Sequence, residues 1–451
     1  MLNVASPECM LDSSSAESAF RRNRSIRLAV VTSFVSKAGT VLLQLISIPI
    51  AMRVLGRAEF GLYTTVNSAL AIISLLEVGV GPALTHGLSR ARVDGDEVKQ
   101  RELSSTAFFL MVGISLVAGL AFATVLLTVP LPLLFGDSFA GRESALRPAL
   151  WVGLGMFLLL FISNLTLRVR EGHLEVASNN LWGAVGNVIG ALFVGVGIWW
   201  IPQVWFLVVA IYGARVAANF FNSLTLLRKH PLMVPALKFF RPAMARHLIS
   251  DGAAFSTCCL VTGIIETSFC VWIIGRTSGP SNVALFGVFS SLTVMQLGFV
   301  VMLSTPTWPA VAEAIAREDY KWARTAAKRL YLYGAGFSIC SALGLFVLGP
   351  WLLPLWLGKE FSSISRVLLG FYGLYFIAHV WRHLNHALMI GTGQVGKLVR
   401  IQLIESTTVA VLGAASLYYG GLEALLGTMG VVILAMTGTF LPKHVARVLK
   451  K

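Results

Sequence analysis

The chain has 451 residues, 56% of them hydrophobic and only 13% charged, and its mean hydropathy is +0.76. Soluble domains carry about 25% charged residues, so this composition excludes an ordinary water-soluble protein and indicates a membrane protein. The net charge of +15 does not indicate a nucleic-acid partner, because the basic residues stand between apolar runs, where they favour an anionic membrane leaflet.

The first 27 residues are polar and serine-rich and end in a group of arginines. We expect residues 1–27 to be a disordered cytoplasmic tail. The apolar run that follows is too long for a signal peptide and has no small-residue cleavage site near its end.

Runs of about 20 mostly apolar residues, the length needed to cross a bilayer, follow one another along the chain. Twelve such runs are present, at 28–54, 62–88, 105–129, 149–169, 180–200, 203–226, 249–275, 284–308, 330–350, 368–390, 401–420 and 422–442. The sequence therefore predicts an all-α, polytopic membrane protein with twelve transmembrane helices.

The loops between these runs differ strongly in basic residues. With the N-terminus inside, 26 of the 36 lysines and arginines fall on the inner segments, seven on the outer segments and three within spans. Because inner loops of membrane proteins are rich in Lys and Arg, we expect both termini to be cytoplasmic in a bacterial inner membrane.

Short phrases recur one half of the chain later. "FGLYTTV" at Phe60 resembles "FGVFSSL" at Phe286, "LLFGDSF" resembles "LWLGKEF", and "REGHLEVA" at Gly172 resembles "GTGQVGKL" at Gly393. Offsets of 226, 222 and 221 residues indicate two six-helix lobes related by a parallel repeat, with substrate bound between them. The predicted parts are a lobe at 28–226, a basic cytoplasmic linker at 227–248, a lobe at 249–442 and a cytoplasmic tail at 443–451.

Polar residues recur at helical steps of three and four inside the spans, so each set shares one helix face. Lipid does not tolerate such faces, which indicates a wet cavity or the bundle interior. The candidate substrate-binding cations are Lys37, Arg215 and Arg382. The polar or gating candidates are Gln44, Asn67, Glu77, Asn219, Glu266 and His379.

Purely structural roles stay open as alternatives for these residues. Lys37 is shallow enough for its amine to reach the membrane surface, and Arg382 is equally compatible with either role. Glu77 and Glu266 fit gating residues, ion-pair partners or a protonation site. Asn67 and Asn219 are more typical of hydrogen bonds between helices than of ligand contacts.

No pattern in the chain indicates catalysis, a cofactor or a metal. A GxxxxGK[ST] loop is absent, and "GTGQVG" at 391–396 follows no strand, so a turn is the better interpretation. His379 and His383 are four residues apart but lack a carboxylate partner in the usual metal-site pattern.

The segment "ISIPIAMRVLGRAEFGLYTTVNSALAIISLLEVGVGPAL" at 46–84 resembles the first two spans of Wzx-type polysaccharide flippases, of the MATE-like MOP superfamily. The likeness lies in an R-x-LG-x-x-x-FG-x-Y pattern beginning at Arg53, followed by an acidic residue, Glu77, before Gly79 and Gly81; many members have Asp at the position of Glu77. "REGHLEVASNN" resembles the family's entry to the fifth span.

The resemblance implies a two-lobed transporter that flips undecaprenyl-diphosphate-linked oligosaccharide across the inner membrane by alternating access. It would serve O-antigen, capsule or exopolysaccharide synthesis beside a polymerase and other export components. The three intramembrane cations would hold the diphosphate or an acidic glycan, and a proton or sodium gradient would drive transport through Glu77 or Glu266.

Two rival functions stay open. One is a cation-coupled multidrug antiporter of the MATE branch, which would use cavity carboxylates. The other is a membrane glycosyltransferase or polymerase, against which the longest outer loop, 130–148, is short for a catalytic domain.

Overall fold

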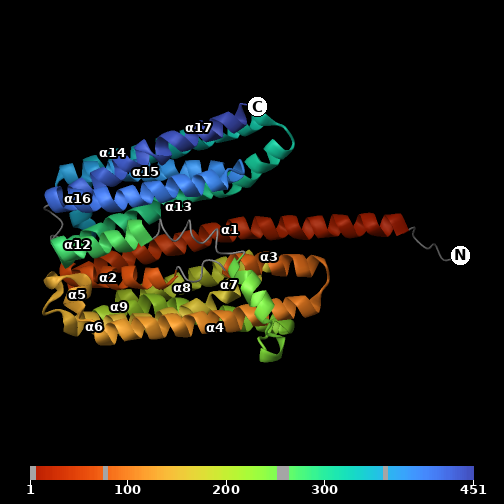
Figure 1. The fold of residues 1–451 in the computed structure, drawn as a ribbon, viewed down its shortest axis with the longest axis horizontal. Coiled ribbons are helices and arrows are strands. Elements are labelled where there is room, and N and C mark those ends of the chain that lie inside the picture. The colour runs from red at the N-terminus through yellow and green to blue at the C-terminus, as the bar shows by residue number, and fades with distance from the viewer. Residues whose placement is uncertain (1–6, 75–79, 251–263, 359–363, 451) are drawn as a thin grey trace.

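The protein is described here by a computed structural model covering residues 7–74, 80–250, 264–358 and 364–450 (Figure 1). Within these ranges the chain is helical and contains no strand. The all-α class that the hydropathy pattern predicts is thereby confirmed.

The helices up to residue 229 form the first lobe. Their bounds are α1 Pro7–Leu55, α2 Arg57–Ser74, α3 Val80–Val93, α4 Glu97–Thr128, α5 Leu131–Phe135, η2 Asp137–Phe139, α6 Glu143–Ser163, α7 Leu165–Gly172, α8 Val176–Gly197, α9 Val204–Val208, η3 Val209–Gly213 and α10 Ala214–Lys229. The linker contains the short turns η4 Pro231–Met233 and η5 Leu237–Phe239, which pack on α4, and it then continues as helix at 242–250.

The description of the second lobe resumes at residue 264 with a π-helical turn. Its elements are η6 Ile264–Phe269, α12 Cys270–Ser278, α13 Pro280–Ala316, α14 Tyr320–Leu357, α15 Arg366–Gly391, α16 Val395–Ala435 and α17 Thr437–Leu449. In Figure 1 the two lobes lie above and below α1, whose N-terminal part projects beyond both.

Eight helices of the described ranges are long and apolar enough to cross a membrane. The predicted second and seventh spans each include residues outside those ranges, and the predicted eleventh and twelfth lie together in one helical stretch, 396–449. The number of twelve spans therefore stays a prediction.

The last two predicted spans are joined by a sharp reversal at Gly421, where the backbone is non-helical (φ 66°, ψ −159°). A Cβ added at Gly413 would lie 3.0 Å from the Leu425 side chain. In a continuous helix these residues would be about 18 Å apart, at 1.5 Å per residue. The chain thus turns back at Gly421, as the "GG" pair at 420–421 indicates.

Residues 7–27, for which the sequence predicts a disordered tail, continue α1 as helix. Neither Gly nor Pro occurs between Glu8 and Ala38, so nothing in this stretch interrupts the hydrogen-bond ladder of the helix.

The two lobes share their turn chemistry. Asp96 caps α4 by accepting a hydrogen bond from the Lys99 backbone N–H at 2.8 Å, and Asp319 caps α14 in the same way from Trp322 at 3.0 Å. An aspartate cap satisfies an amide at the start of a helix that has no partner within it. Equivalent caps in the two halves support the repeat.

Residues with positive φ also recur in pairs, at Gly56 and Gly279, Gly136 and Gly358, and Leu174 and Gly393. The sequence pairs Gly172 with Gly393, but the left-handed residue of that turn in the first lobe is Leu174 (φ 61°), matching Gly393 (φ 72°). The repeat offset there is therefore 219 residues, which corrects the value of 221.

The lobes are joined at one end of the bundle, here called the closed end, on the left of Figure 1. Two glycines allow α2 and α13 to approach there: a Cβ on Gly61 would lie 1.9 Å from the Pro280 carbonyl oxygen, and one on Gly287 would lie 2.6 Å from Thr64. The repeated phrases "FGLY" and "FGVF" therefore meet across the interface between the lobes.

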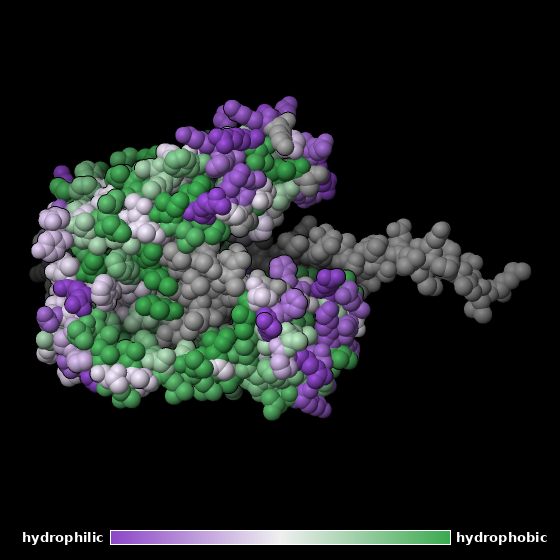
Figure 2. Space-filling view, in the orientation of Figure 1, coloured by the Kyte–Doolittle hydropathy of each residue, from purple (hydrophilic) through white to green (hydrophobic). Residues whose placement is uncertain are grey.

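Hydrogen bonds reinforce the closed end. Arg53 donates to the Leu355 carbonyl at 2.7 Å, Arg57 donates to the Ser281 carbonyl at 2.9 Å, and Ser268 donates to the Ser68 carbonyl at 2.9 Å. At the opposite, open end, the two masses of atoms stand apart in Figure 2, and hydrophilic residues gather at the tip of each. Hydrophobic residues cover much of the surface between the two ends, as expected of a protein embedded in a membrane.

Candidate functional site

The first lobe places Arg215 at the junction of two cavities. Arg215 lies one residue into α10, directly after the π-helical turn η3, and it lines both cavities. Its side chain is exposed to them, and none of the carboxylates in the described ranges lies within ion-pairing distance of its guanidinium.

The cavity on the closed-end side of Arg215 has a volume of about 230 Å³ and includes Gln44, Asn67 and Tyr212 in its wall. The Tyr212 hydroxyl donates a 3.0 Å hydrogen bond to Asn67 Oδ1. The Gln44 Oε1 atom is buried and accepts no hydrogen bond from the described part of the chain. A buried acceptor without a donor is costly, so this site is suited to a hydroxyl or water.

The cavity on the open-end side has a volume of about 400 Å³ and is rich in carboxamides. Asn219 donates to Ser163 Oγ at 3.3 Å and to Asn164 Oδ1 at 3.1 Å, and Asn187 donates to Thr40 Oγ1 at 2.9 Å. The asparagines therefore hold helices together, as the sequence suggests for Asn219, and they also give the cavity a polar wall.

Lys37 belongs to a different cavity from Arg215. Its surroundings are a groove of about 520 Å³ between α1 and α13, with a nearly continuous apolar wall that includes Met295, Phe299 and Met302. No ion pair joins Lys37 to another described residue. The polar face predicted along α1 is thus divided between sites: Gln44 faces the cavity beside Arg215, and Lys37 faces the groove between the lobes.

Arg382 of α15 is the centre of a buried charge cluster in the second lobe. Its two terminal nitrogens contact both oxygens of Glu266, with Nη2 to Oε2 at 2.7 Å, and Nη1 also donates to Glu405 Oε1 at 3.1 Å. Exposed fractions of these side chains are 5% for Arg382, 8% for Glu266 and 0% for Glu405. Nη2 also lies 2.9 Å from His379 Nδ1.

Local backbone irregularities place the two carboxylates. Glu266 projects from the π-helical turn η6, and such a turn inserts one extra residue and displaces side chains from the regular helix face. Glu405 Oε2 accepts a hydrogen bond from the Thr437 backbone N–H at 3.1 Å, at the break between α16 and α17. The N-terminus of a helix stabilises negative charge there.

The structure thus divides the predicted site residues into three groups: Arg215 with Gln44, Asn67 and Asn219; Arg382 with Glu266 and His379; and Lys37 by itself. Glu77 lies outside the described residues. The sequence did not predict that Glu405 pairs with Arg382. It also did not predict that asparagines at the start of α8 line the cavity beside Arg215, although the "ASNN" stretch at 177–180 was a signal for this.

Within the described residues, no three His, Cys, Asp or Glu side chains are grouped to hold a metal ion. The cavities present cations, amides and hydroxyls, which bind and orient polar or anionic groups by hydrogen bonds. The open-end cavity also includes the carboxylate of Glu171, which is paired with Arg168 at 3.1 Å.

Comparison with known sequences gives a family. A sequence model described as "Polysaccharide biosynthesis protein" matches residues 29–315, more than half of the chain. The chain belongs to this family. It is also 21% identical to a Yersinia pseudotuberculosis protein described as an O-antigen export protein, over 91% of this chain and 93% of that one.

A Shigella dysenteriae protein described as an O-antigen transporter gives a shorter match. The two are 24% identical over 35% of this member of the polysaccharide biosynthesis family and 39% of the Shigella protein. The fold resembles that of a multidrug-resistance MATE transporter of the MOP superfamily in its inward-facing conformation, with a TM-score of 0.74 and 15% identity over 93% of this chain and 96% of that one. An outward-facing MATE conformation gives a TM-score of 0.61, at 15% identity over 92% and 97%. This family member is a multi-pass membrane protein with a MATE-like transporter fold.

Proposed function

We propose that the protein flips undecaprenyl-diphosphate-linked oligosaccharide from the cytoplasmic to the periplasmic leaflet of the bacterial inner membrane by alternating access between its two lobes. The family match over residues 29–315, and the export roles in the names of two relatives, support a polysaccharide substrate.

The observation that carries this proposal is Arg215, a guanidinium at the junction of two polar cavities without a neutralising carboxylate in the described ranges. A diphosphate with a hydrophilic glycan cannot cross hydrocarbon unaided, because every unsatisfied polar group costs several kcal/mol there. A guanidinium forms short, charge-assisted and often bidentate bonds to phosphate oxygens. The carboxamides beside Arg215 supply donors and acceptors for sugar hydroxyls.

The groove that contains Lys37 suits the lipid part of the substrate. Its apolar wall lies between the lobes, where an isoprenoid chain stays in contact with hydrocarbon while its headgroup enters the protein. In this proposal Lys37 is a second contact for the diphosphate, at the point where chain and headgroup meet.

The charge cluster of the second lobe has a different proposed role. One arginine faces two glutamates, so the three ionised groups carry one excess negative charge inside the lobe. A proton or a sodium ion would neutralise this charge. We assign the cluster to energy coupling rather than to substrate binding, with Glu266 or Glu405 as the site that is neutralised.

The orientation proposed is with both termini cytoplasmic. The excess of Lys and Arg lies on the loops of the open end, as expected for the cytoplasmic side. The higher TM-score with an inward-facing transporter also supports an opening toward the cytoplasm. A polysaccharide polymerase and other export components are the proposed partners.

The test is complementation of a bacterial strain that lacks its own flippase. Arg215→Gln should abolish surface polysaccharide and cause lipid-linked precursor to accumulate, whereas Arg215→Lys should retain part of the activity. Arg228→Gln, a substitution on the same helix outside both cavities, is the matched control. Normal export by Arg215→Gln at wild-type protein level would contradict the proposal.

Multidrug efflux is the second candidate, favoured by the MATE-like fold alone. A cationic drug would be repelled by Arg215, so we expect the chain to confer no drug resistance in an efflux-deficient host. Clear resistance to cationic drugs would favour efflux over lipid flipping.

A further inference from the structure

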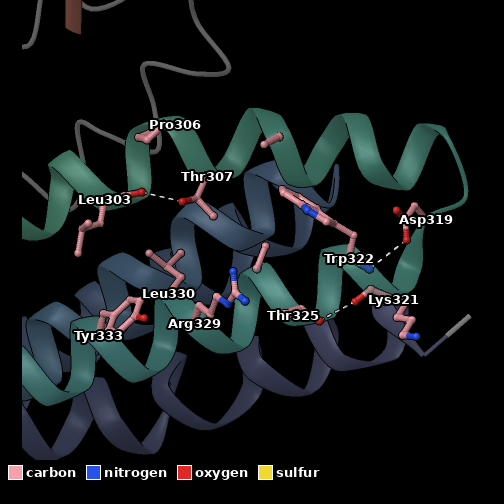
Figure 3. A pocket seen from close by; sticks show the side chains of 12 residues that line it. Leu303, Pro306, Thr307, Asp319, Lys321, Trp322, Thr325, Arg329, Leu330 and Tyr333 are labelled. Atoms are coloured by element: carbon pink, nitrogen blue, oxygen red, sulfur yellow. Dashed lines mark hydrogen bonds between the residues drawn. The ribbon is translucent and has the colours of Figure 1, made fainter. Parts of the chain in front are cut away.

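A further cavity lies outside all three groups of candidate residues, between α13 and α14 (Figure 3). Its volume is about 810 Å³, and it lies near the turn that joins the two helices, at the open end of the second lobe. Pro306 is part of its α13 wall. A proline inside a helix removes one backbone hydrogen bond and bends the helix, which favours separation of the two neighbours here.

The α14 wall of this cavity carries two cations, Lys321 and Arg329. Both are exposed, and neither is paired with a carboxylate of the described chain. The carboxylate that does line the cavity, Asp319, is occupied as the cap of α14, where its Oδ1 accepts the Trp322 N–H at 3.0 Å. The cavity therefore presents a net positive charge.

The same wall becomes aromatic and apolar along α14. The side chains of Trp322, Leu330 and Tyr333 line it, and Trp322 and Tyr333 are 47% and 60% exposed. In Figure 3 Trp322 extends from α14 toward α13. Exposed Trp and Tyr beside basic residues are typical of the membrane interface, where one end of a site is wet and the other apolar.

The cavity also adjoins the groove of Lys37. Leu303 lines the cavity and Met302, its neighbour in α13, lines the groove. Phe299 at the edge of the groove packs on Phe337 of α14, with ring centroids 6.0 Å apart. A lipid with its charged headgroup at Arg329 could therefore place its hydrocarbon chain on the adjoining apolar groove. A soluble anion would make no use of this apolar surface, so the arrangement favours a lipid.

We propose that the α13–α14 cavity binds the phosphate group of a membrane lipid in the leaflet at the open end, with Arg329 and Lys321 as its cationic ligands and Trp322 at the interface. Basic cavities between membrane helices bind anionic lipid headgroups in this way. Two lipids share this chemistry: an anionic phospholipid of the bilayer and an isoprenoid phosphate.

The test is native mass spectrometry of the purified full chain, titrated with phosphatidylglycerol and, separately, with phosphatidylcholine. The double variant Lys321→Gln/Arg329→Gln should retain phosphatidylglycerol at least tenfold more weakly than wild type. The control Arg324→Gln/Lys328→Gln removes the same charge from the same helix without touching the cavity wall and should bind as wild type does. Arg329→Lys should retain most of the binding.

Equal losses in the cavity and control variants would mean only diffuse attraction to a basic surface and would overturn the proposal. Unchanged binding by the cavity variant, or equal retention of phosphatidylcholine, would also overturn it. Melting temperatures of both variants within a few degrees of wild type would establish that each is folded.

A competition arm distinguishes the two lipids. Displacement of phosphatidylglycerol by equimolar undecaprenyl phosphate would assign the site to an isoprenoid phosphate, and its persistence would assign the site to phospholipid. Arg215→Gln should leave this binding unchanged, so failure of the lipid site and failure of the flipping proposal are separate results.

Discussion

Each lobe carries an arginine within the membrane-embedded bundle, but the two have opposite surroundings. Arg215 of the first lobe faces two cavities and has no carboxylate of the described chain within ion-pairing distance, whereas Arg382 of the second is buried between Glu266 and Glu405. An arginine without a partner is available to an anionic ligand, while an arginine in a buried cluster is part of the packing. The lobes have a common fold, yet their charges are arranged differently, and we propose that they serve different tasks.

Elsewhere in the first lobe, cations are paired with carboxylates. Glu175 at the open end contacts Arg170 and Lys229 at 2.5 Å each and His230 at 2.9 Å. The unpaired state of Arg215 is therefore a local feature of the cavities.

The largest effect is expected for Arg382→Met. This change leaves Glu266 and Glu405 buried and uncompensated, and removing one partner of a buried ion pair costs about 3–5 kcal/mol. We expect a strong loss of folded protein and a lower melting temperature in detergent. Glu266→Gln keeps the Glu405 pair and should cost much less; equal losses for the two variants would contradict the cluster as described.

Arg215→Gln should leave stability nearly unchanged in the same assay but should impair transport. The side chain has no partner to lose, so the free energy of unfolding should change by less than about 1 kcal/mol. Transport should fall at least tenfold, because hydrogen bonds to charged groups contribute about 1.5–3 kcal/mol. A destabilisation as large as that of Arg382→Met would remove the distinction between the lobes.

The contact between the lobes can be disturbed at Gly61. A Cβ there would lie 1.9 Å from the Pro280 carbonyl oxygen, so Gly61→Val requires α2 and α13 to separate. Spin labels on the two lobes should report a longer distance across the closed end and a shift away from the present conformation. Gly155→Val, at a position with open space around its Cβ, is the control; an unchanged distance would show that the closed end is not tightly packed.

The smallest effect concerns Glu175 and pH. Burial opposes its ionisation, but hydrogen bonds from His230 and Lys229 outweigh burial and lower its pKa to about 2. Because an unfolded glutamate titrates near 4.3, this group stabilises the fold above about pH 4, and the stability is lost as the pH falls toward 2. The wild type should lose melting temperature between pH 5 and pH 3 more steeply than Glu175→Gln. Glu318→Gln, on a loop of the other lobe, should follow the wild type, and parallel curves for all three would refute the assignment.

The sequence predicted the all-α membrane fold and the repeat because hydropathy and turn residues act locally. Helical spacing also found Arg215, Arg382 and Glu266. It did not reveal that Glu405 reaches Arg382, because the position of Glu405 depends on the break before Thr437, whose backbone N–H donates to its Oε2. Nor did it separate Lys37 from Gln44, since one helix face is divided between cavities by neighbours distant in sequence.

We propose above all that the unpaired guanidinium of the first lobe holds a lipid diphosphate. The most direct measurement is the Kd of undecaprenyl diphosphate for the full chain in nanodiscs, for wild type, Arg215→Gln, Arg215→Lys and Arg228→Gln. We expect an affinity at least tenfold weaker for Arg215→Gln, intermediate for Arg215→Lys and unchanged for Arg228→Gln. Equal affinity for Arg215→Gln and wild type would contradict it.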